Sequence, residues 1–323
     1  MRGKNWHEEL ELLMPPILQA LETRWVLCRP ALSLRLVQEA KHLLTRFRQL
    51  PKRNFQTADM NAKKSPLAVV TGGAHGIGEF AVRKFAGMGF SVAILDVANE
   101  RGNALASELS SCPVRFHECD VSDAEKVEQV SNLTRDEFGE PSILVTSAAL
   151  IPNSESIMEM DLKAHQRMWD VNYNGTIHAC RSFGKQMIVN GGGSIVTLGS
   201  VHSLLPMPFP AYNPGKAAIA RLTQLLAAEL GRYTIRVNSV APTYVMTSEL
   251  QARIDRWPND LGKILGVHAL KILPTPSDIA EAIAFLCSPA ARAITGILLP
   301  VDSGWAASVS YMTYAGGVPW EKI

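Results

Sequence analysis

Seven short runs of β-branched and other apolar residues recur from Ser65 onward, each separated from the next by a longer stretch with helical spacing. Continuous apolar runs are typical of parallel strands buried on both faces, and the stretches between them are long enough for right-handed crossovers. The pattern predicts an α/β fold with a doubly wound, seven-stranded parallel sheet flanked by helices. The predicted strands are Leu67–Thr71, Ser91–Asp96, Val114–Cys119, Ser142–Thr146, Ser194–Gly199, Ile235–Val240 and Ile297–Val301.

Residues 1–64 do not share this rhythm. They carry 12 Lys and Arg against 6 Asp and Glu, whereas the rest of the 323-residue chain carries 20 and 24. Apolar residues at mixed helical spacing between Trp6 and Leu50, interrupted by prolines, predict two or three short helices. We therefore expect a helical or poorly ordered extension over residues 1–64 and a dinucleotide-binding catalytic domain over residues 65–323. An alternative is that the natural product begins at Met60.

The segment Thr71–Gly78, Thr-Gly-Gly-Ala-His-Gly-Ile-Gly, follows the first predicted strand and precedes an amphipathic helix. Glycines let the backbone approach a pyrophosphate, and the free N–H groups and dipole of a helix N-terminus favour its charge. The G-x-x-x-G-x-G spacing differs from the common G-x-G-x-x-G, and a glycine turn can also form without a ligand. In this context it predicts a dinucleotide site formed by Gly72, His75, Gly76, Ile77 and Gly78.

Acidic residues stand at the ends of the next two predicted strands. Asp96 lies 24 residues after Gly72, where a carboxylate can bind the ribose hydroxyls of adenosine and repel a 2′-phosphate. This position predicts NAD rather than NADP, although a strand-terminal Asp can also cap the next helix. Asp120-Val121 follows the third strand and is a candidate for the adenine pocket. Asp120 is equally compatible with a simple N-cap of the helix that begins near Asp123.

Tyr212 and Lys216 lie four residues apart, so that on a helix their side chains share one face. An ammonium beside a phenol is expected to lower the pKa of the phenol from its usual value near ~10. Such a tyrosine can act as an acid or base near neutral pH. Ser200 precedes Tyr212 by twelve residues and Asn172 precedes it by forty. Each residue alone is usually a surface, cap or turn residue, but together they predict a hydride-transfer site.

These motifs resemble those of the classical short-chain dehydrogenase/reductase family over residues 65–305. Thr71–Gly78 is similar to the family's cofactor motif and Asp120-Val121 to its adenine-side pair. The resemblance implies a Rossmann-like fold and an NAD-dependent oxidoreductase that interconverts a secondary alcohol and its ketone. The run Val171–Met187 is similar to a helix of sugar-alcohol dehydrogenases and favours a polyol, although a steroid, a 3-oxoacyl thioester or a cyclic ketone would suit the same residues.

The resemblance also implies a role for each member of a tetrad formed by Asn172, Ser200, Tyr212 and Lys216. Tyr212 would exchange a proton with the substrate oxygen, which the Ser200 hydroxyl would hold, while hydride passes between nicotinamide and the substrate carbon. Lys216 would bind the nicotinamide ribose and lower the pKa of Tyr212, and Asn172 would hold a water for proton relay. Further cofactor contacts are expected from Ala148, Pro242, Val245 and Thr247.

The chain departs from the family pattern in three places. Thr146-Ser147-Ala148-Ala149 stands where the family usually has Asn-Asn-Ala-Gly, and Pro242-Thr243 where it usually has Pro-Gly. A β-branched threonine does not readily adopt a positive φ. Pro214 and Gly215 disfavour a helix unless the proline falls in its first turn. The departures at Thr146–Ala149 and Thr243 motivate a second hypothesis, a nucleotide-binding regulatory protein with little or no turnover.

The expected partner is a small-molecule alcohol or ketone, covered by the segment Thr243–Leu270, which mixes apolar residues with Arg253 and Arg256. These arginines are also compatible with a solvent-facing helix. His202 and Ser203, just after Ser200, are further candidates for lining the site. The C-terminal run Gly296–Trp305 resembles the family's last strand, which commonly packs against a neighbouring subunit. It implies a homo-oligomer, either a tetramer or a dimer.

Other compositional signals argue against several classes of protein. The five cysteines are scattered without a C-x-x-C pair, which predicts a reducing compartment, a cytoplasmic location and no structural zinc. The eight histidines form no H-x-x-x-H pair, and no metal site is predicted. No apolar run reaches the roughly 18 residues of a membrane span. Only the basic leader suggests a nucleic-acid or membrane-surface adaptor, and neither partner is expected.

Overall fold

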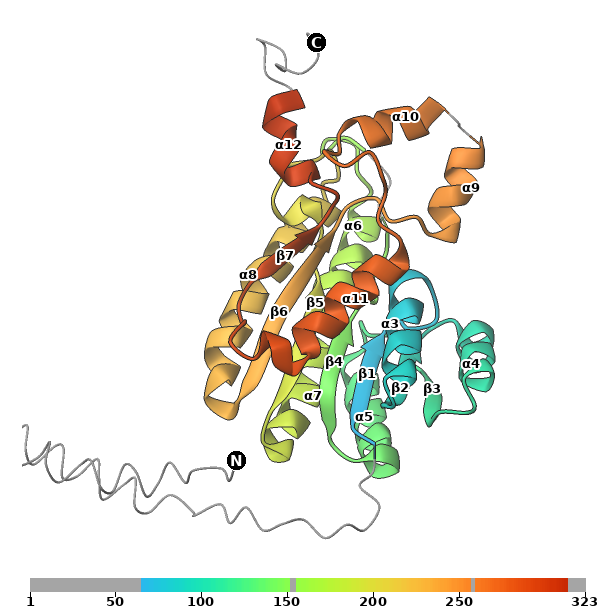
Figure 1. The fold of residues 1–323 in the computed structure, drawn as a ribbon, viewed down its shortest axis with the longest axis vertical. Coiled ribbons are helices and arrows are strands. Elements are labelled where there is room, and N and C mark those ends of the chain that lie inside the picture. Colours follow the sequence, from blue (N-terminus) through green and yellow to red (C-terminus); the bar gives the residue numbers. More distant parts are fainter. Residues whose placement is uncertain (1–64, 152–154, 257–258, 313–323) are drawn as a thin grey trace, which may run out of the picture. The chain divides into compact units, whose positions relative to one another are not determined.

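The computed structural model describes residues 65–151, 155–256 and 259–312, and the predicted extension over residues 1–64 lies outside them. The described chain forms one seven-stranded sheet in which every neighbouring pair is parallel, in the order β3-β2-β1-β4-β5-β6-β7 (Figure 1). The strands are β1 Leu67–Thr71, β2 Ser91–Asp96, β3 Val114–Glu118, β4 Pro141–Thr146, β5 Gly193–Leu198, β6 Ile235–Pro242 and β7 Leu298–Val301. The predicted doubly wound α/β fold is confirmed.

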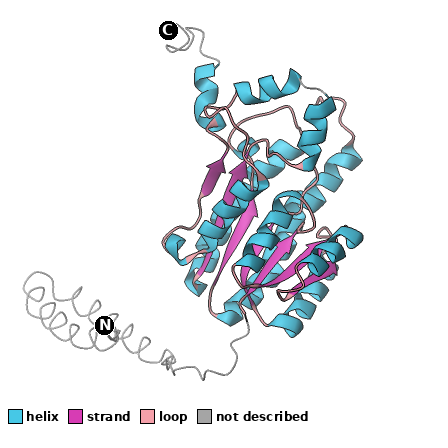
Figure 2. Cartoon of the chain, turned by 45° about the vertical axis from the view of Figure 1, so that its right-hand side comes forward, coloured by secondary structure: helices cyan, strands magenta, loops and turns pink. Residues whose placement is uncertain are grey.

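Helices cover both faces of the sheet (Figure 2). On one face α3, α4 and α11 pack against the strands, and on the other face α5, α7 and α8 do so. The remaining helices lie in the connections near the carboxyl ends of the strands or near the C-terminus of the described chain. The helices are α3 Gly76–Gly87, α4 Asn99–Glu108, α5 Ala124–Phe138, α6 Leu162–Trp169, α7 Gly175–Asn190, α8 Tyr212–Leu230, α9 Ser248–Arg256, α10 Asn259–Gly266, α11 Pro276–Cys287 and α12 Trp305–Met312.

Burial on both faces explains why the strands read as continuous apolar runs. Every residue of β1 and of β2 is buried, and fully buried large side chains fill the space between sheet and helices on each side. Phe85 of α3 and Ile283 of α11 lie on one side, and Phe183 and Met187 of α7 lie on the other. Burying one such side chain contributes about 1.5–3 kcal/mol. The two cores hold the sheet rigid, so that the loops at its carboxyl edge are presented in fixed positions.

The strand order reverses between β1 and β4, which lie side by side in the sheet. Connections run to opposite sides from this point, and open α/β sheets bind ligands in the crevice that results at the carboxyl ends of the strands. Thr71, Asp96, Thr146, Leu198 and Pro242 end β1, β2, β4, β5 and β6 at this edge. The topology therefore brings the predicted site residues, which lie up to 175 positions apart in the sequence, to one edge.

A five-residue π-helical segment, Asp170–Asn174, joins α6 to α7. A π-helical turn accommodates one residue more than the α-helical winding around it, and such turns occur frequently at functional sites. Asp161 caps the N-terminus of α6 by accepting a hydrogen bond from the Lys163 N–H. Asn172 lies at the centre of the π-helical segment and is buried.

Helix α8 begins at Tyr212, so Pro214 is its third residue. The N–H groups of a first turn have no acceptor within the helix, and a proline there costs no hydrogen bond. Gly215 is buried but has open space where a Cβ would lie. The Pro214-Gly215 pair therefore does not disturb the helix. This is the case that the sequence analysis left open, in which the proline falls in the first turn.

None of the helices in the described part of the chain combines the length and the apolar character needed to cross a membrane.

Candidate active site

The glycine turn after β1 is built so that only glycine fits at two of its positions. Gly72 has a positive φ of 64°, and a Cβ there would lie 2.5 Å from the Cα of Ala148. A Cβ on Gly78 would lie 2.0 Å from the carbonyl oxygen of Gly72. The Gly72 N–H donates to the Leu95 carbonyl at 2.7 Å, which fixes the turn against β2. The turn thus brings the start of α3 close to the ends of β1 and β4.

The N-terminus of α3 offers a site for an anion. His75 is its N-cap residue, with extended dihedral angles and no side-chain capping hydrogen bond. Glu79 in the first turn is held by Arg83 and Arg101 at 2.8 and 3.1 Å. Gly76 has a φ of 50° and open space at its Cβ position, bounded by the methyl group of Thr247 at 3.9 Å. Uncapped N–H groups beside an open glycine suit the pyrophosphate of a dinucleotide.

The Asp96 carboxylate stabilises the glycine turn by a hydrogen bond to its backbone. Asp96 is 6% exposed, and its two carboxylate oxygens accept hydrogen bonds from the Ala74 N–H at 2.9 Å and the Ala98 N–H at 3.0 Å. The Nδ1 atom of His75 lies 3.6 Å from the same carboxylate. Ala98 is the N-cap residue of α4, so Asp96 supports the start of that helix as well as the glycine turn. Each carboxylate oxygen can still accept a further hydrogen bond.

Asp120 does not cap α5, because Asp123 is the N-cap residue and accepts from the Glu125 and Lys126 N–H groups. Asp120 instead accepts from Ser122 and forms an ion pair with Arg167 of α6 at 2.7 Å. Burial alone would raise the pKa of Asp120, but these hydrogen bonds hold it below its usual value. The alternative reading of Asp120 as a simple N-cap is therefore wrong.

Val121 is buried in the core between the sheet and α7. A Cβ on Gly175, the first residue of α7, would lie 2.5 Å from its side chain. The Val121 carbonyl is 2.9 Å from the Nδ1 atom of His178. These contacts fix the course of the chain between β3 and α5, from which the Asp120 side chain reaches α6.

Ser200, Tyr212 and Lys216 meet beyond the end of β5. Ser200 is the N-cap residue of a short 3-10 turn, Val201–Ser203, and its hydroxyl donates to the Pro242 carbonyl at 3.4 Å. Tyr212 is half-buried, and its ring centroid lies 5.3 Å from the Nζ atom of Lys216. Lys216 is 3% exposed and donates to the Leu198 carbonyl at 2.6 Å. Three of the four predicted catalytic residues are therefore in one place.

The prediction that Lys216 lowers the pKa of Tyr212 is wrong for this arrangement. Burial raises the pKa of Tyr212 to about 12, and the hydrogen bond with Ser200 offsets only part of that effect. Burial also lowers the pKa of Lys216 to about 8. The ammonium bonds to the Leu198 carbonyl and lies beside the face of the phenol ring. Desolvation therefore outweighs the attraction that the helical spacing led us to expect.

The depressed pKa of Lys216 predicts a pH-dependent stability. Unfolded chains release this proton near pH 10.5 and the folded chain near pH 8, so the unfolded state binds more protons between these values and stability rises with pH. Relative to Lys216→Met, the free energy of unfolding of the wild-type protein should rise by roughly 3 kcal/mol across this window. Urea unfolding of both proteins at a series of pH values measures the difference between their free energies of unfolding. The titration of Tyr212 cancels in this difference, because both proteins contain Tyr212. A difference that does not change with pH would contradict the prediction.

The Asn172 side chain braces the loop after β4. Its amide oxygen accepts from the Leu150 N–H at 2.7 Å, and its amide nitrogen donates to the Leu150 carbonyl at 3.1 Å. Both ends of the amide are thus engaged by one residue. This loop begins within Thr146–Ala149, the segment that differs from the family pattern. In the same segment, the Ala148 N–H donates to the Thr71 hydroxyl at 3.4 Å. The Thr146 hydroxyl is buried and has no partner among the described residues.

Thr243, the second departure from the family pattern, is hydrogen-bonded to His268, a residue that the sequence analysis did not single out. Thr243 does not have a positive φ. Its hydroxyl lies 2.9 Å from the Nε2 atom of His268, whose Nδ1 atom lies 2.7 Å from the Ile264 carbonyl. Because a carbonyl only accepts, Nδ1 carries the proton and Nε2 accepts from Thr243. His268 is fully buried, and it ties the end of β6 to the loop after α10.

Pro242, Val245 and Thr247 occupy three different environments. Pro242 ends β6 and accepts from Ser200, Val245 is buried in the core beside α3, and Thr247 faces Gly76. The Thr247 hydroxyl also accepts from the Leu250 N–H at 3.3 Å, near the start of α9. Pro242 and Thr247 thus adjoin the predicted catalytic and cofactor residues respectively, whereas the Val245 side chain supports the core.

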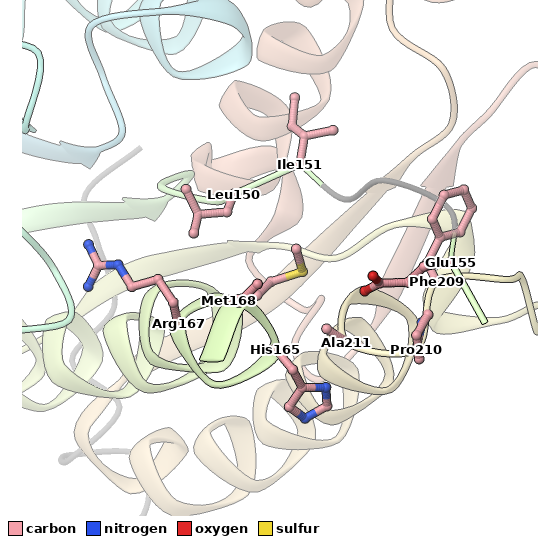
Figure 3. Close-up of a pocket in the computed structure, with 10 residues that line it drawn as sticks. Leu150, Ile151, Glu155, His165, Arg167, Met168, Phe209, Pro210 and Ala211 are labelled. Atoms are coloured by element: carbon pink, nitrogen blue, oxygen red, sulfur yellow. The ribbon is translucent and has the colours of Figure 1, made fainter. Parts of the chain in front are cut away.

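A cleft of about 320 Å³ adjoins the predicted tetrad (Figure 3). Leu150, on one side, is the residue bonded to Asn172, and Ala211, on another, directly precedes Tyr212. None of the lining residues comes from Thr243–Leu270, which we expected to cover the substrate. The lining residues are Leu150, Ile151, Glu155, Ala164, His165, Arg167, Met168, Phe209, Pro210 and Ala211. These residues come from three separate segments, 150–155, 164–168 and 209–211, which carry no periodic signal in the sequence.

Comparison with known proteins identifies the family. The family model described as enoyl-(acyl carrier protein) reductase matches residues 72–306. Short-chain dehydrogenase reductase 4 of Arabidopsis thaliana is 34% identical over 245 residues, which cover 74% of this chain and 82% of the relative. The chain belongs to the short-chain dehydrogenase/reductase family. As a member of it, the chain is an oxidoreductase that acts on CH–OH groups with a nicotinamide cofactor.

Other relatives of this short-chain dehydrogenase/reductase have narrower names. Galactitol 2-dehydrogenase of Rhizobium johnstonii is 34% identical and covers 74% of this chain and 94% of the relative. For (+)-borneol dehydrogenase 2 of Salvia officinalis the identity is 34%, and the shares are 75% and 89%. The solved structure of ElxO with NADP bound superposes with a TM-score of 0.71 at 28% identity, over 76% of this chain and all of that one. The family membership and the superposition both indicate that the described residues form the catalytic domain typical of this family.

Proposed function

We propose that the protein is an NAD-dependent dehydrogenase that interconverts a secondary alcohol, in particular a polyol or sugar alcohol, and its ketone, with Tyr212 as general acid and base. The observation that carries the proposal is the meeting of Ser200, Tyr212 and Lys216 beyond the end of β5, at the edge where the glycine turn opens. A nicotinamide cofactor, when bound, supplies the hydride acceptor for alcohol oxidation.

Each side chain then has a role that its contacts support. The Ser200 hydroxyl, which donates weakly to Pro242 at 3.4 Å, turns to the substrate oxygen and holds it beside the phenol. Tyr212 takes the proton of the alcohol during oxidation and returns it during reduction. Lys216, buried and with its pKa lowered to about 8, passes that proton on near neutral pH. Asn172 holds Leu150, and with it one wall of the cleft, in place.

The preference for NAD is supported by the buried charge of Asp96 at the end of β2. A 2′-phosphate placed within hydrogen-bond distance of that carboxylate would meet a repulsion on the order of 2 kcal/mol or more. Because ElxO was solved with NADP, the family itself does not decide between the two cofactors. The carboxylate, and not the family, therefore carries the preference.

Asp96→Asn is expected to lower the ratio of kcat/KM with NAD to kcat/KM with NADP by about 30-fold, because the variant loses the charge that repels a 2′-phosphate. Its amide nitrogen also replaces one of the two oxygens that accept from Ala74 and Ala98, a loss that both cofactors share and that cancels in the ratio. Steady-state rates with each cofactor measure the ratio. Asp123→Asn is the matched control, since Asp123 also accepts from two backbone N–H groups but caps α5. An unchanged ratio in Asp96→Asn would remove Asp96 as the residue that discriminates.

The polyol preference draws on the relatives and on the cleft. Galactitol 2-dehydrogenase and the D-threitol dehydrogenase of Mycolicibacterium smegmatis are each 34% identical to this chain. The cleft is lined by Glu155, His165 and Arg167 as well as by apolar side chains, and polar groups at the wall suit a substrate with several hydroxyls. The terpenoid named in the borneol dehydrogenase is the competing class.

The test is a panel of polyols, hydroxysteroids, terpenoid alcohols and hydroxyacyl thioesters, each assayed with NAD and NADP by the absorbance of the reduced nicotinamide. Turnover of a polyol with NAD is the expected result. Turnover only of another class would replace the substrate proposal and leave the reaction intact. No turnover of any secondary alcohol, with the cofactor shown to bind, would favour a regulatory protein.

We further propose a cytoplasmic homo-oligomer with a separate extension over residues 1–64. Free cysteines in the described chain, of which Cys119 and Cys180 are buried, support a reducing compartment. The strand β7 lies at the edge of the sheet and is followed in the chain by α12, as expected for an element that packs against a second subunit. Light scattering under assay conditions would show one chain's mass if the assembly proposal is wrong.

A further inference from the structure

The Pro242 carbonyl at the end of β6 sets the direction of the Ser200 hydroxyl. The hydroxyl donates to this carbonyl at 3.4 Å, which is longer than the usual O–H···O distance of about 2.7–2.8 Å. Such a bond orients the hydroxyl and is weak enough to be exchanged for a bond to a substrate oxygen. A shift of the carbonyl toward Ser200 would strengthen the competing bond, and a shift away would leave the hydroxyl without a direction. The position of the end of β6 therefore matters to the proposed reaction.

Thr243, the residue after Pro242, provides a side chain by which this position is held. Its hydroxyl donates to the Nε2 atom of His268 at 2.9 Å, and the Nδ1 atom of His268 donates to the Ile264 carbonyl at 2.7 Å. His268 is 0% exposed. Burial lowers the pKa of His268, so that the ring is neutral at pH 7 and can accept from Thr243. A glycine in place of Thr243 would offer no such bond.

Helix α12 holds His268 in turn. The ring of Trp305, the first residue of α12, has its centroid 5.4 Å from that of the His268 imidazole and stacks on Tyr244 at 5.6 Å with the planes 9° apart. The Ser308 hydroxyl donates to the Val267 carbonyl at 2.8 Å. One buried imidazole thus joins the end of β6, the segment after α10 and the start of α12.

We propose that His268 is a positioning residue for the reaction, which holds Thr243 and, through it, the Pro242 carbonyl to which the Ser200 hydroxyl donates. The imidazole is fully buried and is not among the residues that line the cleft, so it acts through Thr243 and not on the substrate. This inference rests on the proposed function, in which Ser200 holds the substrate oxygen beside Tyr212. Misplacing a group that orients a substrate by about 1 Å can lower a rate by about 100-fold.

Thr243→Val and Thr243→Ser form the matched pair that tests the proposal. Valine keeps the shape of threonine and removes the hydroxyl, whereas serine keeps the hydroxyl. The assay uses the full-length protein, NAD and the secondary alcohol that wild type oxidises fastest. We expect kcat to fall by at least about 10-fold in Thr243→Val and to stay close to the wild-type value in Thr243→Ser. The dissociation constant of NAD should not change in either variant, because the glycine turn and Asp96 are untouched.

His268→Leu and the double variant Thr243→Val/His268→Leu separate positioning from stability. Both should show the same loss of kcat as Thr243→Val, because the same bond is missing in all three and the losses do not add. The melting temperatures should differ, because Thr243→Val alone leaves the buried Nε2 atom unpaired. The double variant removes that defect and should melt above the value expected from adding the two single losses. His268→Gln, whose amide oxygen can accept from Thr243, should recover part of kcat.

Thr223→Val is the control for stability. Thr223 is 1% exposed, and its hydroxyl lies 2.8 Å from the Thr197 hydroxyl, away from the site residues. This variant should lower the melting temperature and leave kcat unchanged. The inference is overturned if Thr243→Val keeps the kcat of wild type, if His268→Gln is no faster than His268→Leu, or if kcat follows the melting temperature in every variant. A wild-type protein that oxidises no secondary alcohol would instead refute the proposed function, and the inference with it.

Discussion

Tyr212→Phe is expected to lower kcat/KM for alcohol oxidation by about 10³-fold or more and to leave the affinity for the nicotinamide cofactor unchanged. Proton transfer by a positioned side chain contributes about 10²–10⁴-fold to a rate, and the variant removes only the atom that carries the proton. The ring that contacts His202 and lies beside the Lys216 ammonium is retained. Steady-state kinetics and a cofactor titration measure the two effects separately.

Tyr233→Phe is the control for this experiment. Tyr233 lies in the 3-10 turn that follows α8 and packs beside the core, where its ring meets the Arg232 guanidinium. Losing that hydroxyl should leave the rate unchanged. A Tyr212→Phe protein as fast as wild type would eliminate Tyr212 as the proton donor. Loss of cofactor binding in the variant would instead assign the hydroxyl a structural role.

Gly78→Ala is expected to destabilise the protein by about 3 kcal/mol and to abolish measurable cofactor binding. The new Cβ would stand 2.0 Å from the carbonyl oxygen of Gly72, and overpacking that displaces backbone costs about this much. Relieving the clash requires α3 to move away from the turn, which separates the helix N-terminus from the site of the anion. Urea unfolding reports the first effect and a cofactor titration the second.

Gly87→Ala provides a control in the same helix. Gly87 is the last residue of α3, and nothing lies within 4 Å of its Cβ position. Alanine there should stabilise the protein by up to about 1 kcal/mol, because it restricts the unfolded chain and favours the helix. Cofactor affinity should not change. A Gly78→Ala protein that unfolds like wild type would show that the turn can deform, contrary to the geometry described above.

The fold could be predicted from the sequence because its signals are local. Each predicted strand is present, with ends displaced by at most two residues. Every residue of β1 and β2 is buried, and strands buried on both faces appear in a sequence as uninterrupted apolar runs. The helix predicted after the glycine turn is present as well, and it begins at Gly76, inside the predicted motif. Helix termini are set by capping within a few residues, and this kind of information survives in a single sequence.

The site was predictable only where its signal lies within one turn or one helix. The spacing of Tyr212 and Lys216 placed both side chains together, but the pKa values depend on burial and on the bond from Lys216 to Leu198, which are tertiary. Asp120 pairs with Arg167, which lies 47 positions away, and no period links the two. Thr243 and His268 are 25 positions apart and likewise meet only in the folded chain.

The cleft shows the same limit. Its walls come from the loop after β4, from α6 and from the segment before α8. In each of these segments polar and apolar residues follow no regular order, so nothing in the sequence marks them as walls of a cleft. The sequence suggested a different cover for the substrate, Thr243–Leu270, only because that segment mixes apolar and charged residues. His202, which its position two residues after Ser200 made a candidate, is not among the residues that line the cleft.

The π-helical segment Asp170–Asn174 makes the length of the chain at this point indispensable. Deleting any one of its residues would restore regular winding and rotate everything before it by about 100° relative to α7, the angle of a single α-helical step. Arg167 would swing away from Asp120, and the wall that carries His165 and Met168 would turn out of register with Leu150. The number of residues in this segment therefore matters as much as the Asn172 side chain that it carries, because the surplus residue sets the rotation of α6 relative to α7.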